Sequence, residues 1–150
     1  MEGAASNRST DNGDSWTLID GGLTNTYVAA LTVSPSGAVF AGTWGGGVFR
    51  SSDNGDHWDP VNTGLTEPFV PSLTANASGD LFAGTDFGSG VFRSTDNGDH
   101  WTPINDGLMS SNGINALIAT PNQVFAGTYG EGVFMGARVG SLRDSLEIYS

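Results

Sequence analysis

Residues 94–101 read Ser-Thr-Asp-Asn-Gly-Asp-His-Trp, and two near-copies of this octapeptide occur earlier in the chain. Residues 51–58 read Ser-Ser-Asp-Asn-Gly-Asp-His-Trp, and residues 9–16 read Ser-Thr-Asp-Asn-Gly-Asp-Ser-Trp. The tryptophans that end the three copies are 42 and then 43 residues apart. Repeats of about 20 to 50 residues are typical of solenoids, propellers and arrays, so the chain is expected to consist of stacked structural units.

Each unit contains the same order of short apolar runs separated by Gly, Pro and Asn. Such runs, rich in Val, Phe and Thr, are typical of β-strands, and helical periodicity is absent before the tail. The runs are 27–33, 38–43 and 47–51 in the first unit, 69–74, 81–85 and 90–94 in the second, and 114–118, 124–128 and 132–134 in the third. With the strand that follows each octapeptide, a unit holds four strands. This predicts an all-β fold of β-propeller blades, whereas a β-helix would have shorter repeats.

Two details of the repeat carry further predictions. The run 27–33 is apolar enough to be a buried strand. The extra residue of the longer interval falls between Thr85 and Gly90, because the spacing from each Trp to the following Ala-Gly-Thr is constant. Insertions are tolerated in loops, so this segment is expected to be a hairpin loop.

The octapeptide has the residue types of a tight turn with an apolar anchor. Its first Asp can accept hydrogen bonds from backbone N–H groups of the turn, Gly permits positive φ, and Ser adds a local hydrogen-bonding group. Trp is expected to fold back between neighbouring sheets as a buried plug. The structural positions are Ser9, Asp11, Gly13, Trp16, Ser51, Asp53, Gly55, Trp58, Ser94, Asp96, Gly98 and Trp101.

With this spacing and strand-turn-strand context, the octapeptide resembles the Asp-box, also called the BNR repeat. That family occurs in β-propellers that include sialidases, sortilin-type receptors, xyloglucan-degrading hydrolases and a photosystem II assembly factor. The resemblance covers residues 8–135 and implies that the octapeptides lie at the blade periphery, away from the central ligand site. It does not select a function, because the functions of the family are diverse.

The repeated carboxylates could alternatively be ligands of a cation. The residues concerned are Asp11, Asp14, Asp53, Asp56, Asp96 and Asp99. The octapeptide lacks the alternating acidic spacing and the distal Glu of an EF-hand loop. Capping of the turn is therefore the preferred interpretation, with a calcium site as the alternative, and no metal or other cofactor is expected.

The two ends of the repeat region are incomplete in complementary ways. The N-terminus has an octapeptide and its outer strand, whereas the C-terminus has the three preceding strands, up to Phe134, without a working octapeptide. Arg138 and Arg143 stand at the Asp and Trp positions of the copy that is due there. Three blades are too few for a ring of about 4–8, so we expect a homodimer that closes head to tail as a six-bladed ring. A fragment of a longer propeller and a nine-bladed trimer are the alternatives.

The composition restricts the partners. The 150 residues fit one domain of net charge −11, with no Lys and five Arg, so nucleic acid and anionic membranes are not expected. Cys is absent, no apolar run approaches the roughly 20 residues of a membrane span, and no signal peptide is visible. A soluble chain is expected. Its compartment stays open, and a secreted or periplasmic location is compatible with this sequence.

Catalysis is not expected from these residues. Arg8, Arg50 and Arg93 precede the three octapeptides at equivalent positions, which indicates a blade-edge role rather than the arginine cluster of a sialidase. Asp86 and Glu131 lie in equivalent loops and are the only pair weighed as the two carboxylates of a glycoside hydrolase. His57 and His100 lie within octapeptides, where a role in the turn is preferred over metal binding.

Aromatic residues follow each Ala-Gly-Thr and give the best candidate for ligand binding. They are Trp44, Phe87 and Tyr129, each on a Gly-containing loop. Such rings can stack on sugars or hold a peptide, and they can also simply pack between blades. The sequence therefore predicts a non-catalytic binding or scaffold module, with a carbohydrate or protein ligand. A lectin-like propeller, a fragment of a glycoside hydrolase or sialidase, and a purely structural building block are the alternatives.

The predicted division of the chain has three parts. Residues 1–8 are a flexible lead-in, residues 9–135 are three blades, and residues 136–150 are an atypical tail that is expected to be mobile.

Overall fold

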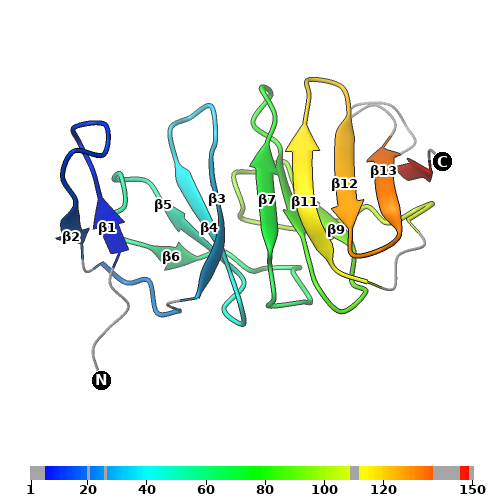
Figure 1. Cartoon of the computed structure of the whole chain (residues 1–150), viewed down its shortest axis with the longest axis horizontal. Coiled ribbons are helices and arrows are strands. Elements are labelled where there is room, and N and C mark those ends of the chain that lie inside the picture. Colours follow the sequence, from blue (N-terminus) through cyan, green and yellow to red (C-terminus); the bar gives the residue numbers. More distant parts are fainter. Residues whose placement is uncertain (1–5, 20, 26, 109–111, 137–145, 149–150) are drawn as a thin grey trace.

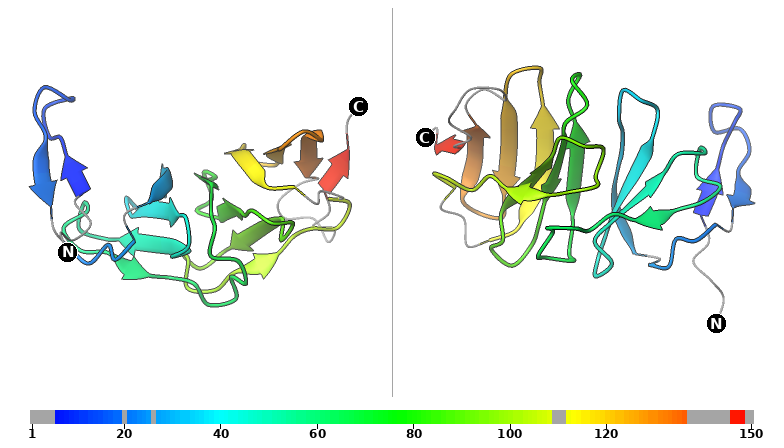
Figure 2. Two further views of the ribbon diagram at one scale, coloured as in Figure 1. Left: turned by 60° about the horizontal axis from the view of Figure 1, so that its bottom comes forward. Right: turned by 180° about the vertical axis from the view of Figure 1, so that it is seen from behind.

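The computed structural model describes residues 6–19, 21–25, 27–108, 112–136 and 146–148. These residues form a two-stranded hairpin and three four-stranded antiparallel sheets, and no helix occurs among them (Figure 1). The sheets follow one another along an arc, with the hairpin at one end and the third sheet at the other (Figure 2). The predicted all-β fold of four-stranded units is confirmed.

Neighbouring strands in each sheet are consecutive in the chain. The hairpin pairs β1 (Ser6–Arg8) with β2 (Thr17–Ile19). The first sheet has the order β3 (Val28–Val33), β4 (Val39–Thr43), β5 (Val48–Ser51) and β6 (Asp59–Pro60). The second has β7 (Ser72–Ala75), β8 (Leu81–Gly84), β9 (Val91–Ser94) and β10 (Thr102–Pro103). The third has β11 (Ile114–Ala119), β12 (Val124–Thr128), β13 (Gly132–Gly136) and β14 (Leu146–Ile148).

The hydrophobic core lies between successive sheets. Because side chains alternate along a strand, each sheet sends one set of side chains toward the sheet before it and another toward the sheet after it. Between the first and second sheets, Phe40 and Val48 from one side pack in one cluster with Leu73, Leu81 and Trp101 from the other. A second cluster joins the second and third sheets in the same way.

The one-residue insertion lies in the predicted hairpin loop. In the first sheet the N–H of Thr43 donates to the carbonyl of Gly47, four residues later. In the second sheet the N–H of Thr85 donates to the carbonyl of Gly90, five residues later. The loop between β8 and β9 is therefore one residue longer than its equivalent, as expected.

Both chain ends contain more strand than the predicted division allows. Ser6–Arg8, assigned to the lead-in, form β1 and pair with β2. Arg8 stands directly before its octapeptide, as Arg50 of β5 does, so β1 is the counterpart of β5. Gly136 belongs to β13, and Leu146–Ile148 of the predicted mobile tail pair with β13 as β14. The predicted lead-in at residues 1–5, and the altered octapeptide positions Arg138 and Arg143, lie outside the described residues. Counted over the described residues, the two ends hold two and four strands, so they do not sum to one four-stranded blade as predicted.

Two predictions of burial are wrong at the N-terminal end. The strand at 27–33 was expected to be buried, yet Leu31 is 64% and Val33 59% exposed. Trp16 is 66% exposed, whereas Trp58 and Trp101 are buried as expected. Leu31 and Val33 point away from the second sheet, toward a side where the described residues provide only the hairpin, and Trp16 lies in that hairpin itself.

Candidate functional site

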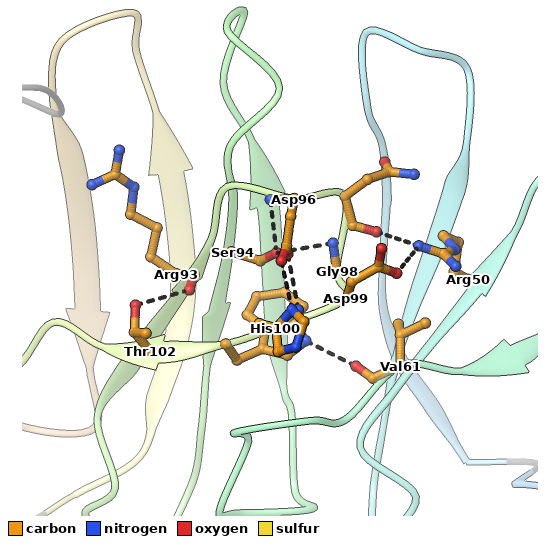
Figure 3. A network of polar contacts seen from close by, with 11 residues as sticks. Arg50, Val61, Arg93, Ser94, Asp96, Gly98, Asp99, His100 and Thr102 are labelled. Atoms are coloured by element: carbon orange, nitrogen blue, oxygen red, sulfur yellow. Dashed lines mark hydrogen bonds and ion pairs between the residues drawn. The ribbon is translucent and has the colours of Figure 1, made fainter.

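The octapeptide forms a closed hydrogen-bonded turn (Figure 3). In the third copy, Ser94 Oγ donates to Asp96 Oδ1 at 2.8 Å and accepts the N–H of Gly98 at 2.9 Å. The same carboxylate accepts the N–H of His100 at 2.9 Å through Oδ1, and its Oδ2 lies 2.7 Å from His100 Nδ1. The carboxylate therefore satisfies one backbone N–H of its own turn and the serine hydroxyl satisfies another, which is the geometry that capping requires.

Asn and Gly at the centre of the octapeptide both adopt left-handed backbone angles. Asn97 has φ of 60° and Gly98 has φ of 90°, and the other two copies repeat these values closely. Only Gly adopts such angles freely, and Asn is the residue that tolerates them best after Gly. The prediction from sequence accounted for Gly and missed Asn, although the Asn-Gly pair shared by the three copies carries that signal.

The turn lowers the pKa values of its first carboxylates. The pKa values of Asp53 and Asp96 fall from 3.8 to about 2, mainly because each accepts the backbone N–H four residues later. The pKa of Asp11 also falls to about 2, and there the hydroxyl of Ser15 is the largest cause. Conversely, the hydrogen bond and charge of Asp53 raise the pKa of His57 above 6.5. These shifts come from contacts inside the turn and indicate a structural role.

The second and third octapeptides also dock on the segment that leaves the preceding unit, and the N–H of Trp58 donates to the carbonyl of Gly21 at 2.8 Å. The backbone N–H of Trp101 donates to the carbonyl of Thr63 at 2.8 Å, and its indole Nε1–H donates to the carbonyl of Val61 at 2.8 Å. Gly64 lies against this contact with φ of 85°, and a Cβ there would stand 2.2 Å from the Trp101 carbonyl oxygen. Only glycine allows this approach, which explains the Gly that precedes Leu65 in the repeat.

Arginine side chains form a second link between sheets. Arg50 Nη1 donates to the carbonyl of Asn97 and to Asp99 Oδ1, both at 2.7 Å, so it joins the first sheet to the next octapeptide. Arg8 Nη1 makes the same contact with Asp56 at 2.8 Å. The predicted blade-edge role of these residues therefore takes the form of a bridge to the next unit.

Arg93 differs from the other two arginines. Its Nη2 donates to Asp80 Oδ2 at 2.9 Å, within its own sheet, and both side chains are mostly buried. The position of a fourth octapeptide, to which the repeat would direct this arginine, falls outside the described residues.

Aromatic residues gather at the opposite end of the sheets from the octapeptides. The chain alternates direction, so the β4–β5 and β8–β9 loops lie at one end and the octapeptides, which follow β5 and β9, at the other (Figure 1). At the first of these ends, the ring centroids of Trp44 and Phe69 are 5.8 Å apart, and those of Phe69 and Phe87 are 5.2 Å apart. Both pairs meet edge to face, a favoured arrangement of aromatic rings. We call this set, together with Tyr27, the aromatic end.

Backbone contacts between units hold the aromatic end in place. Trp44 and Phe69 form an isolated β-bridge, and the N–H of Trp44 donates to the carbonyl of Tyr27 at 2.9 Å. Phe87 has φ of 53°, an unusual angle for an aromatic residue, and the Asp86 carboxylate accepts its N–H at 2.9 Å. Strained backbone held by its surroundings is frequent at ligand sites.

The rings at this end remain open to solvent. Phe87 is 68% and Tyr27 is 71% exposed, and a shallow hollow of about 370 Å³ is lined by Tyr27 and Trp44. Of the predicted loop residues, Trp44 and Phe87 are therefore brought together through Phe69. Tyr129 is 74% exposed on the equivalent loop of the third sheet and makes no ring contact with another described residue.

Two members of the aromatic end were missed in the prediction from sequence. Tyr27 and Phe69 share one repeat position, because their carbonyls accept the N–H of Trp44 and of Asp86 in the same way. In the third unit this position is Gly113, whose carbonyl accepts the N–H of Tyr129. The recurrence of an aromatic residue directly before Val28 and Val70 is the signal that could have found them.

Asp86 and Glu131, the candidate pair for a glycoside hydrolase, each hydrogen-bond with nearby groups. Asp86 accepts the N–H of Phe87, and Glu131 Oε1 accepts the side-chain amide of Asn112 at 3.2 Å. Over the described part of the chain, no group of three or more His, Cys, Asp or Glu residues is placed to hold a metal ion. The same residues contain no helix that is long and apolar enough to cross a membrane.

Comparison with solved structures decides the fold. YCF48 bound to D1 peptide superposes with a TM-score of 0.68 at 19% identity, over 95% of this chain and 46% of that one. The GH74 enzyme of Niastella koreensis gives 0.71 at 16% identity, over 99% of this chain and 27% of that one. The GH74 xyloglucanase of Xanthomonas campestris gives 0.65 at 18% identity, over 93% and 26%. The chain has the β-propeller fold.

The four-stranded sheets are thus propeller blades. The chain spans less than half the length of each of these three propellers. At these identities the likeness concerns the fold alone. No protein-family model matches the sequence. No curated protein matches it either.

Proposed function

We propose that this propeller chain is a non-catalytic binding module of the Asp-box family, with the aromatic end as its ligand face. The observation that carries the proposal is the row of edge-to-face rings Trp44, Phe69 and Phe87. Their loops are held by backbone hydrogen bonds, and Phe87 is 68% exposed. Exposed aromatic rings on rigid loops provide contact area at low cost in conformational entropy, which is why such rings are enriched in binding surfaces.

The charge of the aromatic end supports a polypeptide segment as the ligand. Glu67, Asp86 and Glu131 lie on the loops of this end, and the chain contains no Lys. A segment with neutral or basic side chains would meet this surface without like-charge repulsion. Aromatic and apolar side chains of the same segment would pack against the open faces of Trp44 and Phe87. One structural neighbour, YCF48, is described with a bound peptide, which supports a peptide ligand for this fold.

Peptide arrays probed with the folded chain test the proposal. We expect binding to neutral and basic segments, at least a tenfold loss of affinity in Trp44→Ala and Phe87→Ala, and no loss in Leu18→Ala. Leu18 is 59% exposed on β2, away from the aromatic end, so it controls for the removal of an exposed apolar side chain. Unchanged binding in both aromatic variants would contradict the assigned face.

A carbohydrate is the second candidate ligand. The observation that favours it is the hollow of about 370 Å³ between Tyr27 and Trp44, because open aromatic faces stack on sugar rings. A glycan array combined with a hydrolase assay separates the possibilities. Glycan binding without turnover would support a lectin-like module, and turnover would contradict the non-catalytic assignment.

A further inference from the structure

Among the residues that the structure describes, two apolar blade faces lack the neighbour that their equivalents have. The first, called the front face, consists of Val28, Leu31, Val39 and Trp58 on the side of the first blade away from the second. Val28 is 38% and Leu31 is 64% exposed. The second, called the rear face, consists of Ile118, Phe125 and Val133 on the far side of the third blade, where Ile118 is 61% and Val133 is 56% exposed.

The interior of the chain shows what such faces contact. The second blade presents Val70, Leu73, Leu81 and Trp101 at the positions of the front face, and none of them is more than 8% exposed. They pack in one cluster with Phe40 and Val48, which hold the rear-face positions of the first blade and are fully buried. The interface between the second and third blades repeats this pattern. The front and rear faces are therefore the two halves of an interface that the chain already forms twice.

The hairpin does not substitute for a blade on the front face. A pocket of about 580 Å³ lies between the hairpin and the first blade, lined by Leu31, Val39 and Trp58 among others. In β1, Ser6 and Asn7 stand where β5 has Val48 and Phe49, so this strand brings no large apolar side chain into the gap. The indole Nε1–H of Trp58 is buried there without a hydrogen-bond partner among the described residues, although its equivalent in Trp101 has one.

We propose that a second copy of this chain docks its rear face into this pocket, with β13 of that copy in the place of β1. Strand β13 has the exposed Val133 where β1 has Ser6, so together with Ile118 and Phe125 of the rear face it supplies apolar side chains that the pocket lacks. Strands β11 to β13 of one copy and β2 of the other then form one four-stranded blade. Strands β1 and β14, of three residues each, are displaced from their pairings with β2 and β13.

The exchange breaks two pairings of three residues each, β1 with β2 and β13 with β14, and forms a new pairing of β13 with β2. The displaced β1 holds the link from Arg8 to Asp56, whose side chains are 34% and 51% exposed, and exposed ion pairs contribute little to stability. The arrangement uses different faces of the two copies, so two identical contacts close the pair under two-fold symmetry. Two copies give six blades, inside the usual range of about 4–8, whereas three copies would give nine. This inference concerns assembly and does not depend on the proposed ligand.

Light scattering on a sizing column tests the proposal. We expect the wild type to elute at twice the 15.5 kDa mass of the chain. Leu31→Arg and Val133→Arg each place a charge on one face, and because both side chains are exposed in the single chain, the variants should stay folded by circular dichroism. Each variant alone is expected to be monomeric. Leu18→Arg is the matched control, because its equivalents Pro60 and Pro103 are exposed in complete blades, and it should remain dimeric.

An equal mixture of the two monomeric variants gives the sharper result. The front face of Val133→Arg and the rear face of Leu31→Arg are both intact, so one contact can form and the mixture should associate as a heterodimer. A monomeric wild type, a trimer, or a dimer that survives both substitutions would overturn the proposal. Failure of the mixture to associate would also overturn the proposal, because a head-to-tail contact predicts that the intact front face of one variant binds the intact rear face of the other.

Discussion

At the scale of single residues, the octapeptide is a turn whose polar side chains serve its own backbone. Asp53 accepts the N–H of His57 at 2.8 Å, and its other oxygen lies 2.6 Å from His57 Nδ1. The pKa of Asp53 is lowered to about 2 and that of His57 is raised. The stabilisation from Asp53 is therefore present above its ordinary value of 3.8 and lost as the pH falls toward 2. The stabilisation from His57 is present below 6.5 and lost as the pH rises through its folded pKa.

The coupling between these two side chains gives a direct prediction. Asp53→Asn should lower the pKa of His57 toward 6.5, because the carboxylate is the largest cause of its upward shift. Asp59→Asn is the control, since Asp59 is the smallest of the contributing charges and should move the pKa much less. Proton NMR titration of the imidazole measures both. An equal shift in the two variants would show that the hydrogen bond is not the cause.

Of the three repeated tryptophans, Trp101 is the most deeply buried. Trp101 is 3% exposed, belongs to the main core cluster and donates to the Val61 carbonyl. Trp101→Ala should lower the free energy of unfolding by about 3–5 kcal/mol. Leu18→Ala, at an exposed position, should change it by less than about 0.5 kcal/mol. Chemical denaturation of both variants checks this, and similar small losses would mean that the indole is not an anchor.

At the scale of elements, the linker between blades depends on glycine at one point of contact. Gly64 has φ of 85° and lies against the backbone of Trp101, whereas Gly37 has a similar φ of 86° and a Cβ there would meet no atom within 4 Å. Gly64→Ala should therefore destabilise the fold well beyond the roughly 1 kcal/mol expected of Gly37→Ala, which changes only the backbone preference. Thermal unfolding of the Gly64→Ala and Gly37→Ala variants tests this prediction, and equal melting temperatures would argue against the tight contact at Gly64.

The same elements show how far the sequence predicts this structure. The three inner strands of each blade follow from apolar runs and turn residues, because those signals are local. The exposure of Leu31 does not follow, since burial of that face depends on a neighbouring blade rather than on the strand itself. Phe69 was missed at the aromatic end because it joins Trp44 through an isolated bridge between units, a contact that no local pattern encodes. Strand β14 was missed because its segment departs from the repeat.

At the scale of the whole molecule, three blades lie along an arc with one apolar face open at each end (Figure 2). Inside the chain, the same two kinds of face bury each other at both blade interfaces. The aromatic end is formed by loops of neighbouring units, so a completed ring would present it once from each copy around a common axis. Assembly would then place two ligand faces on one particle, which favours binding to repetitive ligands.

Small-angle X-ray scattering of the wild-type chain tests this account most directly, because it reports the size and the shape of the particle together. A closed ring of two chains is a compact body of twice 150 residues, for which we predict a radius of gyration of about 19 Å. A single compact chain would give about 15 Å, and an open head-to-tail polymer would give a larger value that grows with concentration. Either of those results would contradict a ring completed by two copies.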